Sequence, residues 1–327
     1  MGPGLVRAQE ELPSLFDLGV SPGQATAVVL PVPWEVSTSF RRGTSGGPLA
    51  VLRASVQVDL YDPWLGSPEV HGMAMLPVPE ELPGWIAQAR AALRQQDLTG
   101  VDRLAGRRDE LVRPLVAELL QQGKAPVVLG GEHGVSLGGI AAAAQEAPLG
   151  VLQVDAHADL RSQYQGLRSS HACFAARVLE LSGVERLVQV GVRDLCRQEA
   201  ETASGDPRIA TFYDAHWQAE RIEQVVQALP QRVWISWDID GLDPALCPST
   251  GTPVPGGLRW REALSLLRAV ALSGRRIVGC DLCEVVPQGG RYRPGEGWDE
   301  IVAAQLLYRL CGWMLVSRGV HRPDPCG

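Results

Sequence analysis

The chain has 327 residues, of which 45% are apolar and 20% charged, and its formal net charge is −7. This length is ample for a sizeable core, while the lack of a long Lys/Arg cluster excludes nucleic acid as an expected partner. No apolar run approaches the roughly 20 residues needed to span a bilayer, so no membrane partner is expected. Seven scattered cysteines indicate a reducing, cytoplasmic compartment rather than a disulfide framework.

The first third of the chain predicts short elements separated by loops. The segment 31–48, PVPWEVSTSFRRGTSGGP, forms a loop whose length is typical of functional loops. Apolar runs, alternation and helical spacing predict the elements around it. In order, these are an N-terminal arm (1–24), a strand (25–32), a helix (49–55), a strand (56–61), a Pro-rich surface crossing (62–83) and two helices (82–96 and 110–122).

From residue 125 onward, apolar strands alternate with helices. Near-continuous apolar strands in this rhythm predict a parallel sheet covered on both faces, and therefore an α/β fold. No shift in composition marks a second domain, so residues 25–327 are expected to form one domain. The strands are expected at 125–129, 149–154, 184–190, 209–213, 233–237 and 276–286, and the helices at 135–145, 171–181, 217–229, 259–272 and 299–315.

Polar residues cluster where these strands end. In open α/β sheets the site lies outside the carboxyl ends of the strands. The residues at such ends are His133 in GGEHG, Asp155, His157 and Asp159 in DAHAD, Asp238 and Asp240 in SWDID, and Glu284 in DLCEVVP.

The pair Asp238 and Asp240 indicates a bound cation. Residues two apart on an extended backbone face the same way, and two carboxylates about 4 Å apart repel by roughly 4 kcal/mol at an effective dielectric of 20. A divalent metal turns this repulsion into ligation. Taken singly, the pair could also be a turn with solvated acids, His133 a core histidine, and Asp155 or Asp159 a helix N-cap.

Taken together, these residues favour a metal site. Two histidines and four aspartates, with no cysteine, suit Mn²⁺ or a similar ion better than structural zinc. Six ligands exceed the needs of one open catalytic ion, whereas two ions about 3.5–4 Å apart use them all. The expected cofactor is therefore a pair of Mn²⁺ ions held by His133, Asp155, His157, Asp159, Asp238 and Asp240.

Four blocks of the chain resemble the signature sequences of the ureohydrolase family of arginases, agmatinases and formimidoylglutamases. They are GGEHG, VDAHADLRSQYQG, SHACF and SWDIDGLDPALCPSTGTPVPGG, and the segment 31–48 resembles the agmatinase branch. The resemblance implies a three-layer α-β-α fold with a mostly parallel eight-stranded sheet and two Mn²⁺ per subunit. It also implies a homo-oligomer, either a trimer or a hexamer.

The resemblance implies roles for individual residues. His133, Asp155, Asp159 and Asp238 would hold one ion, and Asp155, His157, Asp238 and Asp240 the other. Asp159 would also orient the attacking water. His171 of SHACF would move protons near the leaving amine, and Glu284 would hold the substrate guanidinium. Glu284 could alternatively be a structural ion-pair member.

The implied reaction cleaves a guanidino group to urea and a primary amine. Agmatine, giving putrescine in polyamine biosynthesis, comes first, with aminopropylagmatine or guanidinobutyrate close behind, and arginine and formimidoylglutamate as further family substrates. Arg161 stands where arginases commonly carry an Asn, which counts against arginine. The blocks GGEHG and SHACF depart from the commoner sequences of the family. These differences predict altered support around His133 and an altered wall beside His171.

Two other classes of protein compete with this interpretation. A metal-dependent amide deacetylase of related architecture would need an adjacent His-His pair, which does not occur in this sequence. A binding or regulatory protein that had lost activity would not need all six candidate ligands together with His171 and Glu284.

Overall fold

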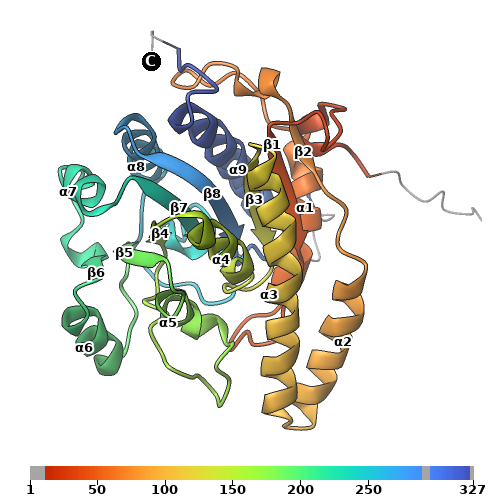
Figure 1. Cartoon of the computed structure of the whole chain (residues 1–327), viewed down its shortest axis with the longest axis vertical. Helices are drawn as coiled ribbons and strands as arrows, with labels where there is room; N and C mark the ends of the chain where they lie inside the picture. The colour runs from red at the N-terminus through yellow and green to blue at the C-terminus, as the bar shows by residue number, and fades with distance from the viewer. Residues whose placement is uncertain (1–11, 289–294, 325–327) are drawn as a thin grey trace, which may run out of the picture.

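The computed structural model describes residues 12–288 and 295–324 and is built around one eight-stranded sheet (Figure 1). All paired strands run parallel, in the order β2-β1-β3-β8-β7-β4-β5-β6. The strands are β1 (Ala27–Val32), β2 (Met73–Met75), β3 (Ala125–Gly130), β4 (Leu149–Val154), β5 (Val184–Val190), β6 (Ile209–Phe212), β7 (Arg232–Asp238) and β8 (Arg276–Cys283).

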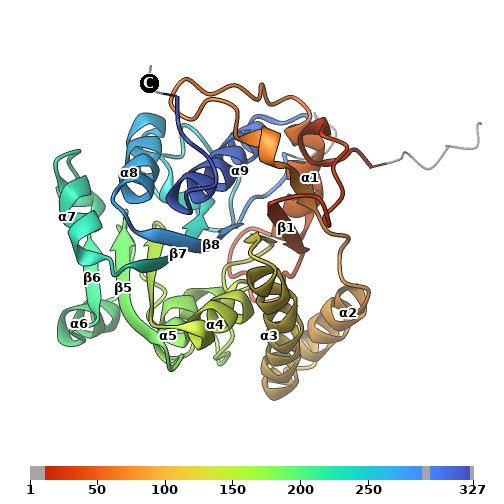
Figure 2. The same cartoon turned by 45° about the horizontal axis from the view of Figure 1, so that its top comes forward.

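Helices cover both faces of the sheet (Figure 2). One face carries α1 (Gly47–Ser55), α7 (Arg221–Ala228), α8 (Trp260–Leu272) and α9 (Trp298–Ser317). The other carries α2 (Glu81–Arg94), α3 (Leu98–Gln121), α4 (Leu137–Glu146), α5 (Phe174–Leu179) and α6 (Arg197–Gly205). A separate apolar core fills each side, which confirms the predicted three-layer α-β-α architecture.

The central strands are apolar because both of their faces are covered. β1, β3 and β4 are buried at every residue. Trp234 in β7 is fully buried, and its indole occupies the space beside Gly279 in β8 and Gly139 in α4. A side chain at Gly279 would overlap that indole, so glycine is required there by close approach.

Several predicted elements are wrong in the first third of the chain. Residues 56–61 form turns and bends instead of a strand, and Val58 is buried there without strand pairing. The Pro-rich crossing contains the short strand β2, and α3 begins at Leu98 instead of residue 110. Asp97 caps α3 by accepting a hydrogen bond from the backbone of Gly100. The polar helix α6 was not predicted.

The described part of the expected N-terminal arm packs against the domain. Leu15 and Phe16 are buried, and the Phe16 ring meets Tyr308 of α9 edge to face at 5.2 Å between centroids. Among the described residues, no helix combines the length and the apolar character that a bilayer crossing requires.

Candidate active site

The predicted site residues meet at the carboxyl ends of four neighbouring strands. β3, β8, β7 and β4 are adjacent in the sheet although far apart in the sequence. His133 follows β3, Asp155 follows β4, Asp238 ends β7 and Glu284 follows β8. The sheet order therefore brings together side chains that the sequence separates by up to 151 positions.

A first cluster surrounds the His133 ring. Its Nδ1 lies 3.0 Å from Asp155 Oδ2, 3.1 Å from Asp159 Oδ2 and 3.5 Å from Asp238 Oδ2. All four residues are buried. Asp159 has a backbone φ of 51°, in the left-handed region. Such strain in a non-glycine residue is typical of functional sites.

A second cluster shares Asp155 with the first. His157 Nδ1 lies 3.1 Å from Asp240 Oδ2 and 3.5 Å from Asp155 Oδ1. Asp240 and Asp238 are linked by a hydrogen bond from the Asp240 backbone N–H to Asp238 Oδ1, at 2.9 Å. The structure thus brings all six predicted ligands into two adjoining groups.

The donor set of these clusters fits divalent cations. His133 Nδ1 and Asp240 Oδ2 are buried, and among the described residues their close contacts, to Asp155 Oδ2 and His157 Nδ1, lack the geometry of a well-directed hydrogen bond. Burial, followed by repulsion from Asp240 and Asp155, raises the pKa of Asp238 well above its usual range. Burial, followed by the Asp155 charge, also raises the pKa of Asp159. Cations held by these acids would relieve both penalties and would give His133 Nδ1 and Asp240 Oδ2 a partner.

The far side of the His133 ring is held by a hydrogen-bonded pair. His133 Nε2 lies 3.0 Å from Ser236 Oγ, which donates a hydrogen bond to Asp281 Oδ1 at 2.9 Å. Trp234 Nε1 donates to the other Asp281 oxygen. Because the Ser236 hydroxyl donates its own proton to Asp281, it can accept a hydrogen bond from Nε2, and Nδ1 is the ring nitrogen that faces the acids.

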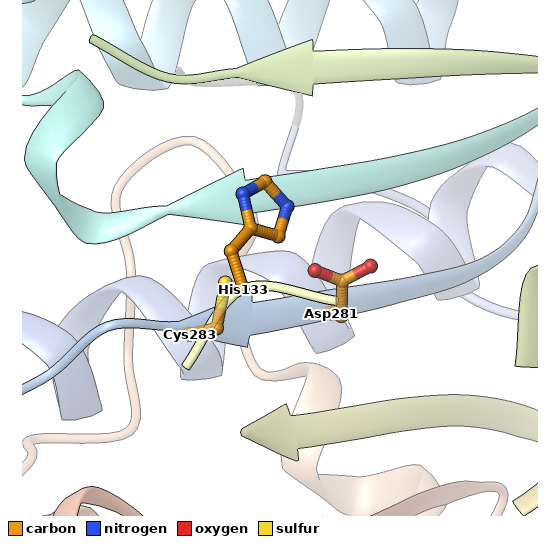
Figure 3. A group of neighbouring side chains, drawn as sticks. All are labelled: His133, Asp281 and Cys283. Carbon is orange, nitrogen blue, oxygen red and sulfur yellow. The ribbon is translucent and has the colours of Figure 1, made fainter. Parts of the chain in front are cut away.

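Figure 3 shows Asp281 and Cys283 on β8 with the His133 ring beside them. Their potential ligand atoms lie within 4.8 Å of one another. Both carboxylate oxygens of Asp281 accept hydrogen bonds, and the Cys283 thiol donates to the Trp237 carbonyl oxygen. Because Asp281 and Cys283 already make these hydrogen bonds, we interpret them as structural neighbours of His133 and not as ligands of a further metal ion.

Buried amides support Asp155 in the same way. Gln153 Nε2 donates to Asp155 Oδ2 at 2.8 Å, and Gln189 Nε2 donates to Gln153 Oε1 at 2.9 Å. Four supporting residues were not predicted from the sequence, namely Gln153, Gln189, Ser236 and Asp281. Their signal was present, because each is a polar residue at a buried position of a largely apolar strand, where an unpaired polar group is costly.

Four of the six candidate ligands line a cavity of about 270 Å³, and this part of its lining is termed the floor. His171, predicted to move protons, stands in its wall. Arg161 reaches the same cavity, where it pairs with Glu199 at 3.4 Å and lies over the Tyr164 ring. The remaining lining residues are Ser39, Phe40, His133, His157, Asp159, Ala172, Asp194, Asp238, Thr252, Pro253 and Val254.

Glu284 lies behind this wall and is 1% exposed. Its Oε1 accepts a hydrogen bond from the His133 backbone N–H at 2.7 Å and lies 3.5 Å from His171 Nδ1. Although burial opposes the imidazolium, Glu284 raises the pKa of His171. Glu284 has a backbone φ of 63°, so it is a second site residue in the left-handed region.

Two carboxylates fasten the first loop, residues 33–46, over the cavity. Glu132 Oε2 accepts hydrogen bonds from the backbone N–H groups of Val36, Ser37 and Thr38 at 2.7–3.0 Å. Glu35 Oε2 accepts from the backbone of Gly43 and Ser45. The Glu132 of GGEHG therefore holds this loop. The Phe174 of SHACF stacks on the His133 ring, with 3.9 Å between ring centroids.

This chain is similar to several known proteins. A family model described as the arginase family matches residues 25–312. The N(1)-aminopropylagmatine ureohydrolase of Synechocystis is 33% identical over 88% of this chain and 89% of its own length, and that of Thermus thermophilus is 37% identical over 88% and 90%. The crystal structure of the agmatine ureohydrolase of Thermoplasma volcanium is similar, with a TM-score of 0.74, 27% identity and coverage of 95% and 97%.

Proposed function

The chain belongs to the arginase family and is an enzyme acting on guanidino groups, and from this premise we propose that it hydrolyses a guanidino amine to urea and a primary amine. One observation carries the proposal. Two acid–histidine clusters that share Asp155 lie at the floor of a cavity whose wall contains His171. That arrangement combines a place for two cations with a proton donor at the same opening.

A guanidinium group needs such a site because it is cationic, planar and a poor electrophile. Its hydrolysis requires a strong nucleophile at neutral pH, a group that holds its charge, and a proton for the departing amine. Two divalent ions, when bound, supply the nucleophile by lowering the pKa of a bound water. The residues proposed to hold them, as Mn²⁺, are His133, Asp155, His157, Asp159, Asp238 and Asp240.

The side chains around the cavity complete the proposed chemistry. Asp159 orients the attacking water by a hydrogen bond, and His171 delivers a proton to the leaving nitrogen. Glu284 offsets the positive charge of the guanidinium and of His171, whose Nδ1 lies 3.5 Å from its carboxylate. All three roles are assigned to side chains that the structure brings together at this site.

The cavity rim favours a substrate with a cationic tail. Asp194 lines the cavity with a side chain that is 67% exposed, and Arg161 is paired with the buried Glu199. Two carboxylates and one guanidinium leave this rim with net negative charge, which attracts an ammonium and repels a carboxylate. Agmatine and its aminopropyl derivative have such tails, whereas guanidinobutyrate does not.

The relatives alter the order of the candidate substrates. The sequence alone places agmatine first, but the two ureohydrolases that are 33% and 37% identical are named for N(1)-aminopropylagmatine. We therefore propose N(1)-aminopropylagmatine as the preferred substrate. Agmatine, the compound in the name of the Thermoplasma enzyme, comes second. That the protein forms a trimer or a hexamer remains a prediction.

Urea release from a substrate panel tests this proposal. The purified protein, supplied with Mn²⁺, is assayed with N(1)-aminopropylagmatine, agmatine, guanidinobutyrate and arginine. We expect the highest kcat/KM for N(1)-aminopropylagmatine, then agmatine, with the carboxylate-bearing compounds at least about tenfold lower. A preference for guanidinobutyrate or arginine would contradict the charge argument, and no urea from any compound would contradict the function.

Metal content provides a second test. We expect close to two Mn²⁺ per chain at saturation, because two clusters share Asp155 and together contain more carboxylates than one ion needs. The measurement is elemental analysis of protein reloaded with Mn²⁺ and freed of excess ion. A single equivalent accompanied by full activity would exclude a binuclear centre.

The substitution Glu284→Gln tests whether the negative charge of Glu284 offsets the positive charge of the substrate guanidinium. The amide keeps an oxygen that can accept the hydrogen bond from the His133 backbone, so metal content and Tm should stay near wild type. We expect kcat/KM for the best substrate to fall at least about tenfold, since charge-assisted hydrogen bonds are lost. If Tm instead drops by many degrees while kcat/KM is unchanged, Glu284 is a structural residue.

A further inference from the structure

Ser39 of the first loop places a hydroxyl group against His171. Ser39 Oγ lies 3.1 Å from His171 Nε2, a contact between residues 132 positions apart. Both residues line the cavity, and Ser39 is half-buried there. Nothing in the metal clusters requires a hydroxyl at this position.

The contact completes a row of three side chains. His171 Nδ1 faces Glu284 at 3.5 Å, while Nε2 faces Ser39. A carboxylate only accepts hydrogen bonds, so Glu284 favours the proton on Nδ1. A hydroxyl both donates and accepts, so Ser39 can donate to a neutral His171 and accept from a charged one. The row therefore accommodates both protonation states of His171.

The local structure holds this hydroxyl in place. The His171 backbone N–H donates a hydrogen bond to Ser37 Oγ at 2.9 Å, which ties the first loop to the wall of the cavity. Glu132 binds the backbone of the three residues immediately before Ser39. Groups fixed on both sides of a proton path lose little freedom when the proton moves.

We propose that Ser39 is a catalytic residue that relays the proton of His171 to the leaving nitrogen. Both ring nitrogens of His171 are engaged, so a direct transfer would first have to break one of its contacts. In the relay, His171 Nε2–H passes its proton to Ser39 Oγ while the Ser39 hydroxyl proton passes to the leaving nitrogen. The breaking C–N bond leaves its electron pair on that nitrogen, and His171 ends neutral.

A double-mutant cycle tests the relay, which rests on the proposed function. We expect Ser39→Ala to lower kcat at least about tenfold while KM stays within about twofold, and Ser39→Thr to restore most of the loss because it keeps the hydroxyl. In a His171→Ala background, Ser39→Ala should change kcat by less than about twofold, since the relay is already broken. Equal factors in both backgrounds would overturn the relay.

Thr38→Ala is the matched control, because Thr38 belongs to the same loop and its backbone also binds Glu132. We expect it to retain wild-type kcat. The histidine ring ¹⁵N signals of protein loaded with diamagnetic Mg²⁺ report on the contact without turnover. Ser39→Ala should shift the His171 signal, assigned with His171→Ala, and Thr38→Ala should not.

The two readouts separate the relay from the proposed function. An unchanged His171 signal in Ser39→Ala, in a protein whose wild type releases urea, would overturn the relay alone. If the wild type releases no urea from any guanidino compound, the proposed function fails and the relay fails with it.

Discussion

Asp238→Ala is expected to abolish urea release and to reduce the bound Mn²⁺ well below two per chain. Asp238 Oδ2 faces His133 of the first cluster, and Oδ1 accepts the backbone N–H of Asp240 in the second. The carboxylate therefore contacts both clusters, and its removal would take a proposed ligand from the metal centre. Without both ions, attack on the guanidinium loses its nucleophile.

Urea release and metal content of the variant, measured at saturating Mn²⁺, check this result. Asp243→Ala is the control, because Asp243 lies in the same segment and its side chain accepts a hydrogen bond from the backbone of Ala245 in a turn. We expect that variant to keep its metal and its activity. An Asp238→Ala protein with two ions and wild-type turnover would remove Asp238 from the centre.

His171→Ala should lower kcat by about 10²–10⁴-fold and leave the Mn²⁺ content unchanged, because proton transfer by a positioned side chain contributes about that factor. His171 stands in the cavity wall and contacts Glu284 and Ser39. Its loss removes a proton donor but no ligand of the two clusters. The His171→Ala variant should therefore still release urea faster than the Asp238→Ala variant, and this difference distinguishes proton transfer from metal binding.

The exposed His216 provides the matched control for His171. His216→Ala should behave as wild type in urea release and metal binding. Complete loss of activity in both His171→Ala and Asp238→Ala, with full metal content in both, would show that the division between proton transfer and metal binding is wrong.

The sequence predicts the strands of the second half of the fold well because most of them are buried on both faces. The predicted strand at 149–154 and that at 184–190 coincide with β4 and β5. The segment 56–61 misleads because a turn after α1 that buries Val58 produces the same alternation as a half-buried strand. β2 is missed because three residues between proline-containing segments are too short to show a period.

The proximity of the six candidate ligands was predictable because each lies at or just after the carboxyl end of a strand, at one edge of the sheet. The residues that support these ligands were harder to predict from the sequence. Ser236 and Asp281, for example, form a pair only because β7 and β8 are neighbours in the sheet. The contact between Ser39 and His171 crosses 132 positions and has no local pattern. Such contacts depend on how the layers close, which periodicity does not encode.

Much of the first loop is held through its main chain. Glu132 and Glu35 bind main-chain N–H groups, which every residue except proline provides. The Phe40 side chain, 70% exposed, takes part in none of these hydrogen bonds, so we expect that its exchange leaves the loop in place. The fold thus offers a place where new substrate preferences can arise, by evolution or by design, while the catalytic floor stays untouched.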